Sequence, residues 1–258
     1  MDVCALTGKH GKFIRSHLYP QAFYDFPEDQ APFKMIGGRN NRPRTNWTGL
    51  YDERLVIQDG EDLLSKLDNA AAKMLLPRAS AQQFFESADE LQMSGQGDKV
   101  AFAIFNKWDV ETLLVFFCSI LWRFGASKRP EASGTELGPY LPLLQEAILR
   151  NKAPDSASVG VSLLRIVDSE GSFAFTPARY EAEGVNMWQL VFGNFQVNIR
   201  CDRRKPPFPY SKLEMQANKP AAIMAYEFTR SRSYENVARM VQSSTRAHGW
   251  PWGNAWPR

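Results

Sequence analysis

Hydrophobic positions follow a helical period in the first part of the chain. Between residues 60 and 76, apolar side chains recur three or four positions apart, which is the spacing of one face of an amphipathic helix, and Asp59 is expected to cap that helix. A further helix is expected over residues 81–91. Residues 110–127, VETLLVFFCSILWRFGAS, are apolar on nearly all sides and predict a helix at the centre of the core, opened by Asn106 or Asp109. A shorter amphipathic helix is expected over residues 140–151, YLPLLQEAILRN.

From Val159 onward the pattern becomes that of strands. Four segments are rich in β-branched and aromatic residues and are separated by Gly, Asn and Pro, which predicts consecutive antiparallel strands: VGVSLLRIV, SFAFTP, NMWQLVFGNFQVNIRC and AAIMAYEFT. Within the third segment, Gln196, Asn198 and Arg200 alternate with apolar residues, so one face of that strand is expected to meet solvent. The segment SYENVARMVQSSTRAH predicts a C-terminal helix capped by Ser233.

These patterns together predict an α+β protein with three parts. The first is a small N-terminal subdomain, residues 1–77, in which the turn LTGKHGK joins two short strands and leads to the first helix. The second part, residues 78–152, is helical. The third, residues 158–258, is a mostly antiparallel sheet with the terminal helix. We expect residues 78–258 to form one body.

Composition supports a globular chain. Of 258 residues, 44% are hydrophobic and 23% charged, which argues against disorder. The longest apolar run, residues 113–122, is too short to span a bilayer, and charged residues interrupt the N-terminal segment early. We therefore expect a cytoplasmic protein with no membrane partner. The pattern does not set the oligomeric state.

Basic residues gather in two short segments. Although the net charge is only +3, these clusters could hold phosphates of nucleic acid or contact a partner protein. The alternative is that they are solvated loops of a mildly basic protein. The two clusters are Arg39, Arg42 and Arg44 in the first, and Arg203, Arg204 and Lys205 in the second.

The segment CALTGKHGKFIRSHLYP, residues 4–20, ends in a His-x-x-Pro pattern at His17. This pattern resembles that of ββα-metal (HNH-type) nucleases. In those enzymes such a histidine is the general base toward water, and a hairpin-plus-helix frame holds a divalent ion against the phosphate. Residues 4–152 also resemble a family of largely uncharacterised bacterial and phage proteins. That family pairs a C-x-x-C-G hairpin and an R-S-H-I-I-P segment with L-C-x-x-C-E, S-L-L-W-R-x-S and L-G-P-Y helices.

The resemblance implies that a structural zinc site has been lost. Cys4 keeps the first zinc-ligand position, whereas Thr7, Ile57 and Gly60 stand where the other three cysteines would be. Only three cysteines occur in the chain and none forms a CxxC pair. We expect no structural zinc, with burial of Ile57 and the apolar face of the first helix holding the hairpin instead.

The same resemblance implies a candidate catalytic set. His17 remains, Glu61 lies where HNH nucleases often place a residue that contacts the ion, and Asp68 follows seven residues later on about the same helix face. A histidine and two carboxylates could bind Mg²⁺ or Mn²⁺. The alternative is that Glu61 is a first-turn carboxylate favoured by the helix dipole and Asp68 is exposed to solvent.

Two functions follow from these residues. The first is a nucleic-acid- or protein-binding component of a bacterial or phage conflict (defence or counter-defence) system, built on a degenerate, zinc-less HNH-like frame. The second is an active Mg²⁺-dependent DNA endonuclease with His17 as general base. Apart from that Mg²⁺ at Glu61 and Asp68, no cofactor is expected.

Overall fold

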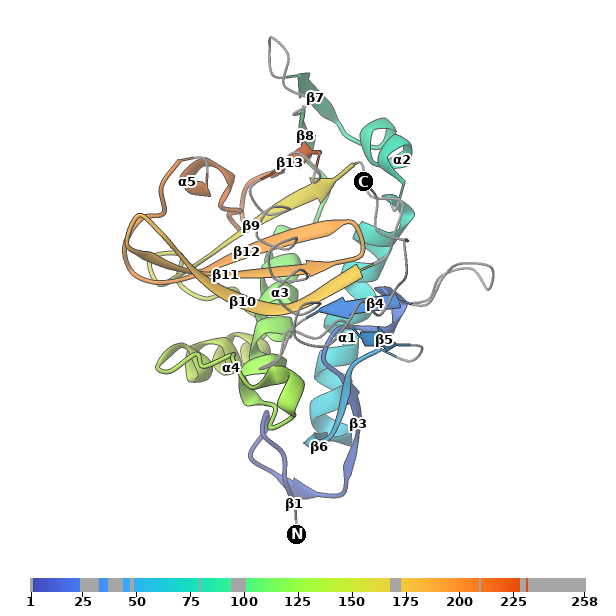
Figure 1. The fold of residues 1–258 in the computed structure, drawn as a ribbon, viewed down its shortest axis with the longest axis vertical. Coiled ribbons are helices and arrows are strands. Elements are labelled where there is room, and N and C mark those ends of the chain that lie inside the picture. The colour runs from blue at the N-terminus through green and yellow to red at the C-terminus, as the bar shows by residue number, and fades with distance from the viewer. Residues whose placement is uncertain are drawn as a thin grey trace, which may run out of the picture.

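A computed structural model of the chain describes residues 2–23, 33–36, 44–46, 49–78, 80–93, 101–167, 173–208, 210–227 and 231. The fold confirms the α+β class: a large, mostly antiparallel sheet lies in front of a layer of helices (Figure 1). The terminal helix expected after Ser233 lies outside the described residues.

Nine strands form the main sheet among the described residues, in the order β5-β4-β10-β11-β12-β9-β13-β8-β7. The pairs β4–β10 and β9–β13 are parallel and the others antiparallel. The strands are β4 Phe33–Ile36, β5 Arg44–Asn46, β7 Glu90–Met93, β8 Ala101–Phe105, β9 Val159–Ile166, β10 Phe173–Ala182, β11 Val185–Phe192, β12 Phe195–Cys201 and β13 Ala221–Tyr226.

The antiparallel prediction is confirmed for β9 to β12 and is wrong for the last strand. β13 runs parallel to β9, with Met224 opposite Leu164, and takes β8 as its other neighbour. Strands β7 and β8 were not expected either. The helix predicted over residues 81–91 is the short α2 (Ala81–Glu86), which a capping box between Ser80 and Gln83 opens. It ends at Glu86 because residues 90–93 pair with β8 as strand β7 instead.

Three long helices pack together behind the sheet. They are α1 (Gln58–Leu75), α3 (Val110–Ala126) and α4 (Tyr140–Arg150), and α5 (Tyr210–Leu213) is a single turn at the sheet's edge (Figure 1). α3 is buried from Val110 to Phe124 apart from its first-turn polar residues, as its apolar sequence predicted, and Phe116 and Phe117 contact Phe192 of β11. α1 and α4 pack against α3.

The start of α1 differs from the prediction. Ile57 occupies the N-cap position, with no side-chain hydrogen bond to the helix, because β6 (Tyr51–Ile57) continues directly into α1. Asp59 lies in the first turn and forms an exposed ion pair with Lys9 (2.7 Å). For α3, Asp109 is confirmed as the cap: its Oδ1 accepts from the Thr112 amide at 3.1 Å.

The expected solvent-facing side of β12 is instead buried. Gln196, Asn198 and Arg200 are each at most 3% exposed. Tyrosines two strands away on either side, on β13 and β10, supply hydrogen bonds: the Tyr226 hydroxyl donates to Gln196 Oε1 (2.6 Å) and the Tyr180 hydroxyl to Asn198 Oδ1 (3.2 Å). Because these polar groups find partners inside the protein, alternation of polar and apolar residues did not indicate exposure here.

Residues on both sides of position 77 contribute to one hydrophobic core, which extends from Cys4 to Ala225. α1 packs on α3, and β4 joins the main sheet beside β10. The division into residues 1–77 and 78–258 stays a prediction. Among the described residues, no helix has the length and apolar character needed to cross a membrane.

Candidate functional site

The N-terminal turn is closed by backbone and sulfur hydrogen bonds. β1 (Asp2–Val3) pairs with β2 (His10–Gly11), confirming the two short strands expected there. The Cys4 amide donates to the Lys9 carbonyl and the Gly8 amide to the Cys4 carbonyl, both at 2.9 Å. The Thr7 amide donates to Cys4 Sγ at 3.4 Å. Gly8 adopts φ +68°, which a glycine tolerates without strain.

The four positions that the resemblance assigns to zinc ligands, Cys4, Thr7, Ile57 and Gly60, lie close together around the Cys4 sulfur. A Cβ atom built on Gly60 would stand 2.9 Å from Cys4 Sγ, and one on Gly11 would stand 3.1 Å from Ile57 Cδ1. Burial raises the pKa of the Cys4 thiol, but hydrogen bonds from Thr7 and from the Ile57 backbone outweigh it and lower that pKa. Ile57 is 7% exposed, so apolar packing holds the hairpin against α1.

His17, Glu61 and Asp68 meet around a buried arginine that the sequence analysis had not singled out. His17 ends β3 (Phe13–His17), which pairs with β6, while Glu61 and Asp68 lie on α1. Arg123 of α3, 1% exposed, donates from Nη2 to Asp68 Oδ1 (2.6 Å) and from Nη1 to the His17 carbonyl oxygen (3.1 Å). We call these residues, together with Ser16, the Arg123 cluster.

Burial controls the ionisation of both carboxyls in the Arg123 cluster. Burial raises the pKa of Asp68, and the charges of Arg123 and His17 oppose that rise. Burial likewise raises the pKa of Glu61, opposed by the nearby Ser16 hydroxyl and the Arg123 charge. Glu61 Oε2 and Ser16 Oγ are both buried without a hydrogen bond in normal geometry. The Asp68 side chain is 17% exposed and paired, so the alternative of a solvent-exposed Asp68 is wrong.

The contacts of the Arg123 cluster argue against a metal ion bound at Asp68. Within the described parts of the chain, no group of three or more His, Cys, Asp or Glu side chains is placed to hold a metal ion. Asp68, one of the two carboxylates expected to bind Mg²⁺, already holds Arg123. An ion at Asp68 would have to share the carboxylate with the buried Arg123 guanidinium, whose positive charge would repel it.

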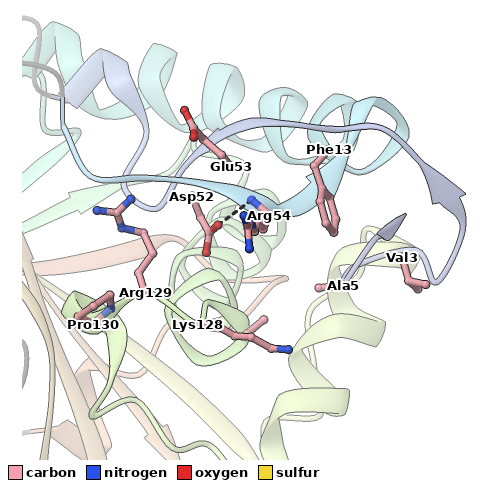
Figure 2. Close-up of a pocket in the computed structure, with 10 residues that line it drawn as sticks. Val3, Ala5, Phe13, Asp52, Glu53, Arg54, Lys128, Arg129 and Pro130 are labelled. Atoms are coloured by element: carbon pink, nitrogen blue, oxygen red, sulfur yellow. Dashed lines mark hydrogen bonds between the residues drawn. The ribbon is translucent and has the colours of Figure 1, made fainter. Parts of the chain in front are cut away.

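Beside the Arg123 cluster, a pocket of about 640 Å³ opens between β6 and the end of α3 (Figure 2). Its basic lining comes from Arg54, Lys128 and Arg129. Asp52 is engaged within the protein, accepting from the Ser127 hydroxyl at 2.6 Å and from the Arg54 amide at 2.8 Å. In Figure 2, Glu53 points to the opposite side of β6 from Asp52 and Arg54. We call this the β6–α3 pocket; its other lining residues are Val3, Ala5, Phe13, Ala126 and Pro130.

Tyr51 connects the β6–α3 pocket to His17. The Arg15 guanidinium lies 3.5 Å from the centroid of the Tyr51 ring and that of Arg129 lies 5.7 Å away, both within cation–π range. The His17 ring packs edge-on against Tyr51, with centroids 6.1 Å apart. Arg129 also pairs with Glu131 (3.2 Å). Cations and an aromatic ring therefore lie next to the histidine.

Of the two basic clusters named from the sequence, the one that the structure describes lies elsewhere. Arg39 and Arg42, and the side chain of Arg44 on β5, lie outside the described residues. Arg203, Arg204 and Lys205 are exposed and follow β12 toward α5, away from β3 and β6 (Figure 1). Arg204 is bound to Asp202 (2.6 Å), and this contact holds the pKa of Asp202 well below its usual range.

One sequence signal could have revealed Arg123. It is the charged residue near the end of an otherwise apolar helix, VETLLVFFCSILWRFGA, and a charge on such a helix needs a buried partner.

Comparisons of the chain with protein-family models, with curated proteins and with solved structures find no match.

Proposed function

We propose that this protein binds nucleic acid through the cations of the β6–α3 pocket. The observation that carries the proposal is the convergence of Arg54, Lys128 and Arg129 on one pocket whose buried carboxylate, Asp52, is satisfied by internal hydrogen bonds. Because Asp52 is already bound, Arg54 and Lys128 remain available to meet phosphate oxygens, whereas Arg129 also pairs with Glu131 at 3.2 Å. A role in a bacterial or phage conflict system rests on the sequence resemblance.

Nucleic-acid binding is favoured over metal-dependent catalysis because the Asp68 carboxylate is already engaged in an ion pair. This carboxylate forms a 2.6 Å ion pair with Arg123, whose side chain is fully buried. A buried pair of this kind is costly to open, since each charge would lose its partner in a poorly solvated place. The contact therefore supports a structural role for Arg123 and Asp68, in which they join α1, α3 and β3.

The proposal is tested by fluorescence anisotropy with a labelled DNA duplex at low salt. We expect Arg54→Ala and Lys128→Ala each to weaken binding by about two- to fivefold, the range of a solvent-exposed ion pair. Lys73→Ala, an exposed lysine near the end of α1, is the matched control and is expected to bind like the wild type. Absence of duplex binding by the wild type, or equal loss in Lys73→Ala, would overturn the proposal and would favour a partner protein.

One observation favours the second candidate, a Mg²⁺-dependent endonuclease: the fold brings His17, Glu61 and Asp68 into a single cluster. Plasmid nicking with Mg²⁺ or Mn²⁺ separates the two functions. Cleavage by the wild type that disappears in His17→Ala would establish the nuclease, whereas the binding proposal expects no metal-dependent cleavage from either protein.

A further inference from the structure

Phe208 is displayed to solvent on a well-anchored segment. Its side chain is 81% exposed, by far the most exposed of the large hydrophobic residues in the described chain. It lies between β12 and α5, in the sequence RRKPPFPY. Pro206 before it and Leu213 after it are buried, and the Ser211 amide donates to the Pro207 carbonyl at 3.1 Å. An exposed aromatic ring held by buried neighbours suggests a contact made with another molecule.

A buried ion pair fixes the base of this segment. Arg200, 4% exposed in its side chain, forms two bonds to the Glu214 carboxylate, at 2.6 and 3.1 Å. Its Nη2 also donates to the Ser156 carbonyl (2.7 Å), and its Nη1 donates to the Asp202 carbonyl. The Met215 amide also joins the end of the segment to β9 through the Val161 carbonyl at 2.8 Å. Because both ends are held, Phe208 loses little conformational freedom when it meets a ligand.

Three cationic residues lie within a few positions of Phe208 in the sequence. Arg203, Lys205 and Lys212 are exposed, and none forms an ion pair with any residue that the structure describes. Arg204 is bound to Asp202 and lies near Glu181, so it is not counted among the available cations. Residues 203–212 therefore carry one exposed aromatic ring and three positive charges without a described ion-pair partner.

We propose that Phe208, Arg203, Lys205 and Lys212 form a binding surface for single-stranded nucleic acid, on which one base stacks against the Phe208 ring and the cations meet the flanking phosphates. Aromatic rings and cations along a backbone path are the two components of such surfaces. A protruding ring requires an unstacked base, which a single strand offers and an intact duplex does not. This inference rests on the proposed nucleic-acid binding and adds a second surface and a strand preference to it.

The experiment is anisotropy with a labelled single-stranded oligothymidylate of about 12 nucleotides, within the site sizes typical of such surfaces. We expect Phe208→Ala to weaken binding by about tenfold, the lower range of one base–aromatic stack, and Phe208→Trp to retain it. Since the side chain is exposed, neither change should alter the fold, which circular dichroism checks. Duplex binding is expected to be unchanged in Phe208→Ala.

The outcomes separate this surface from the β6–α3 pocket. Duplex binding that needs Lys128, with no binding of the single strand, overturns this inference and leaves the proposed function standing. Single-strand binding that needs Phe208 but not Lys128 supports this surface, and the pocket is contradicted only if the wild type also fails to bind the duplex. Equal affinities of Phe208→Ala and wild type for the single strand also overturn the inference. Loss of binding to anionic lipid vesicles in Phe208→Ala, with oligonucleotide binding intact, would assign the surface to a membrane instead.

Discussion

Replacing Arg123 with methionine tests the structural role assigned to the Arg123 cluster. Methionine keeps much of the aliphatic stem that packs inside α3, so the change removes the charge and the hydrogen bonds more than the packing. In the variant, Asp68 loses its 2.6 Å partner and the His17 carbonyl loses a 3.1 Å donor. We expect a less stable protein with the same fold.

The size of the loss follows from burial. Removing one partner of a buried ion pair costs about 3–5 kcal/mol. Asp68 keeps 17% of its side-chain exposure, so water solvates the abandoned carboxylate in part and the lower end, about 3 kcal/mol, applies. The lost bond to the His17 carbonyl adds about 1 kcal/mol. Domains are stable by about 5–15 kcal/mol in total, so the change should be large and measurable.

Urea denaturation followed by circular dichroism at about pH 7 measures this difference. The double variant Arg123→Met/Asp68→Leu should recover most of the lost stability, because it removes both charges rather than leaving one buried. Arg150→Met is the matched control: its pair with Glu146 on α4 is exposed, so its loss should cost less than about 0.5 kcal/mol.

Lowering the pH tests independently whether the ionised Asp68 carboxylate causes the loss of stability in Arg123→Met. Without Arg123, the pKa of the folded-state Asp68 should rise further above its unfolded value. A carboxyl with a raised folded pKa destabilises the fold when ionised, and this penalty disappears below the unfolded pKa of about 3.9. The gap between wild type and Arg123→Met should therefore narrow as the pH falls from about 7 toward 4. A loss below about 1 kcal/mol at neutral pH, or a double variant no more stable than Arg123→Met, would refute the reasoning.

Three further changes probe the packing. Gly60→Cys places a Cβ 2.9 Å from Cys4 Sγ, so oxidation should form a disulfide, detected as loss of two reactive thiols after unfolding. Because burial raises the pKa of Glu61, its ionised form weakens the fold; Glu61→Gln should raise the melting temperature at neutral pH, and the gain should fade as the pH falls through about 4.3. A Cβ at Gly160 would overlap the Glu214 carboxylate, so Gly160→Ala should cost about 1–3 kcal/mol in urea denaturation.

Each change has a control. Cys4→Ser in the Gly60→Cys background should leave the new thiol reactive. Cys118 and Cys201 keep their thiols in either case, so four reactive thiols rather than two after oxidation of Gly60→Cys itself would contradict the geometry. Asp62→Asn, on an exposed carboxylate of the same helix turn, should not reproduce the pH-dependent gain of Glu61→Gln. Gly134→Ala adds a methyl with no atom within 4 Å and should be nearly neutral, so an equal loss there would contradict the argument for Gly160.

The sequence predicted the long helices and most strands because their patterns are local. The all-round apolar character of α3 and the many β-branched and aromatic residues of β9 to β12 reflect burial that each segment needs by itself. The partner of a strand is not a local property. The parallel pairing of β13 with β9 and the addition of β7 and β8 to the sheet depend on contacts between segments far apart in the chain. The same holds for the buried polar face of β12, whose partners lie on other strands.

Some residues of the candidate site could be predicted from the sequence, and others could not. The motif around His17 and the spacing of Glu61 and Asp68 identified residues that the fold brings together. The sequence could not show that Arg123, 55 positions after Asp68, would bind that carboxylate. Among the pocket cations, Lys128 and Arg129 are adjacent, but Arg54 lies far earlier in the chain, so the sequence does not mark the three as one group.

The salt dependence of DNA binding tests the central claim most directly. A protein that neutralises phosphates releases counterions, and the slope of log K against log salt is about −0.9 for each phosphate contact. Over about 50–200 mM salt, we predict that the double variant Arg54→Ala/Lys128→Ala binds a duplex with a slope shallower than that of the wild type by about two. Equal slopes for the two proteins would contradict the claim that these cations hold phosphates.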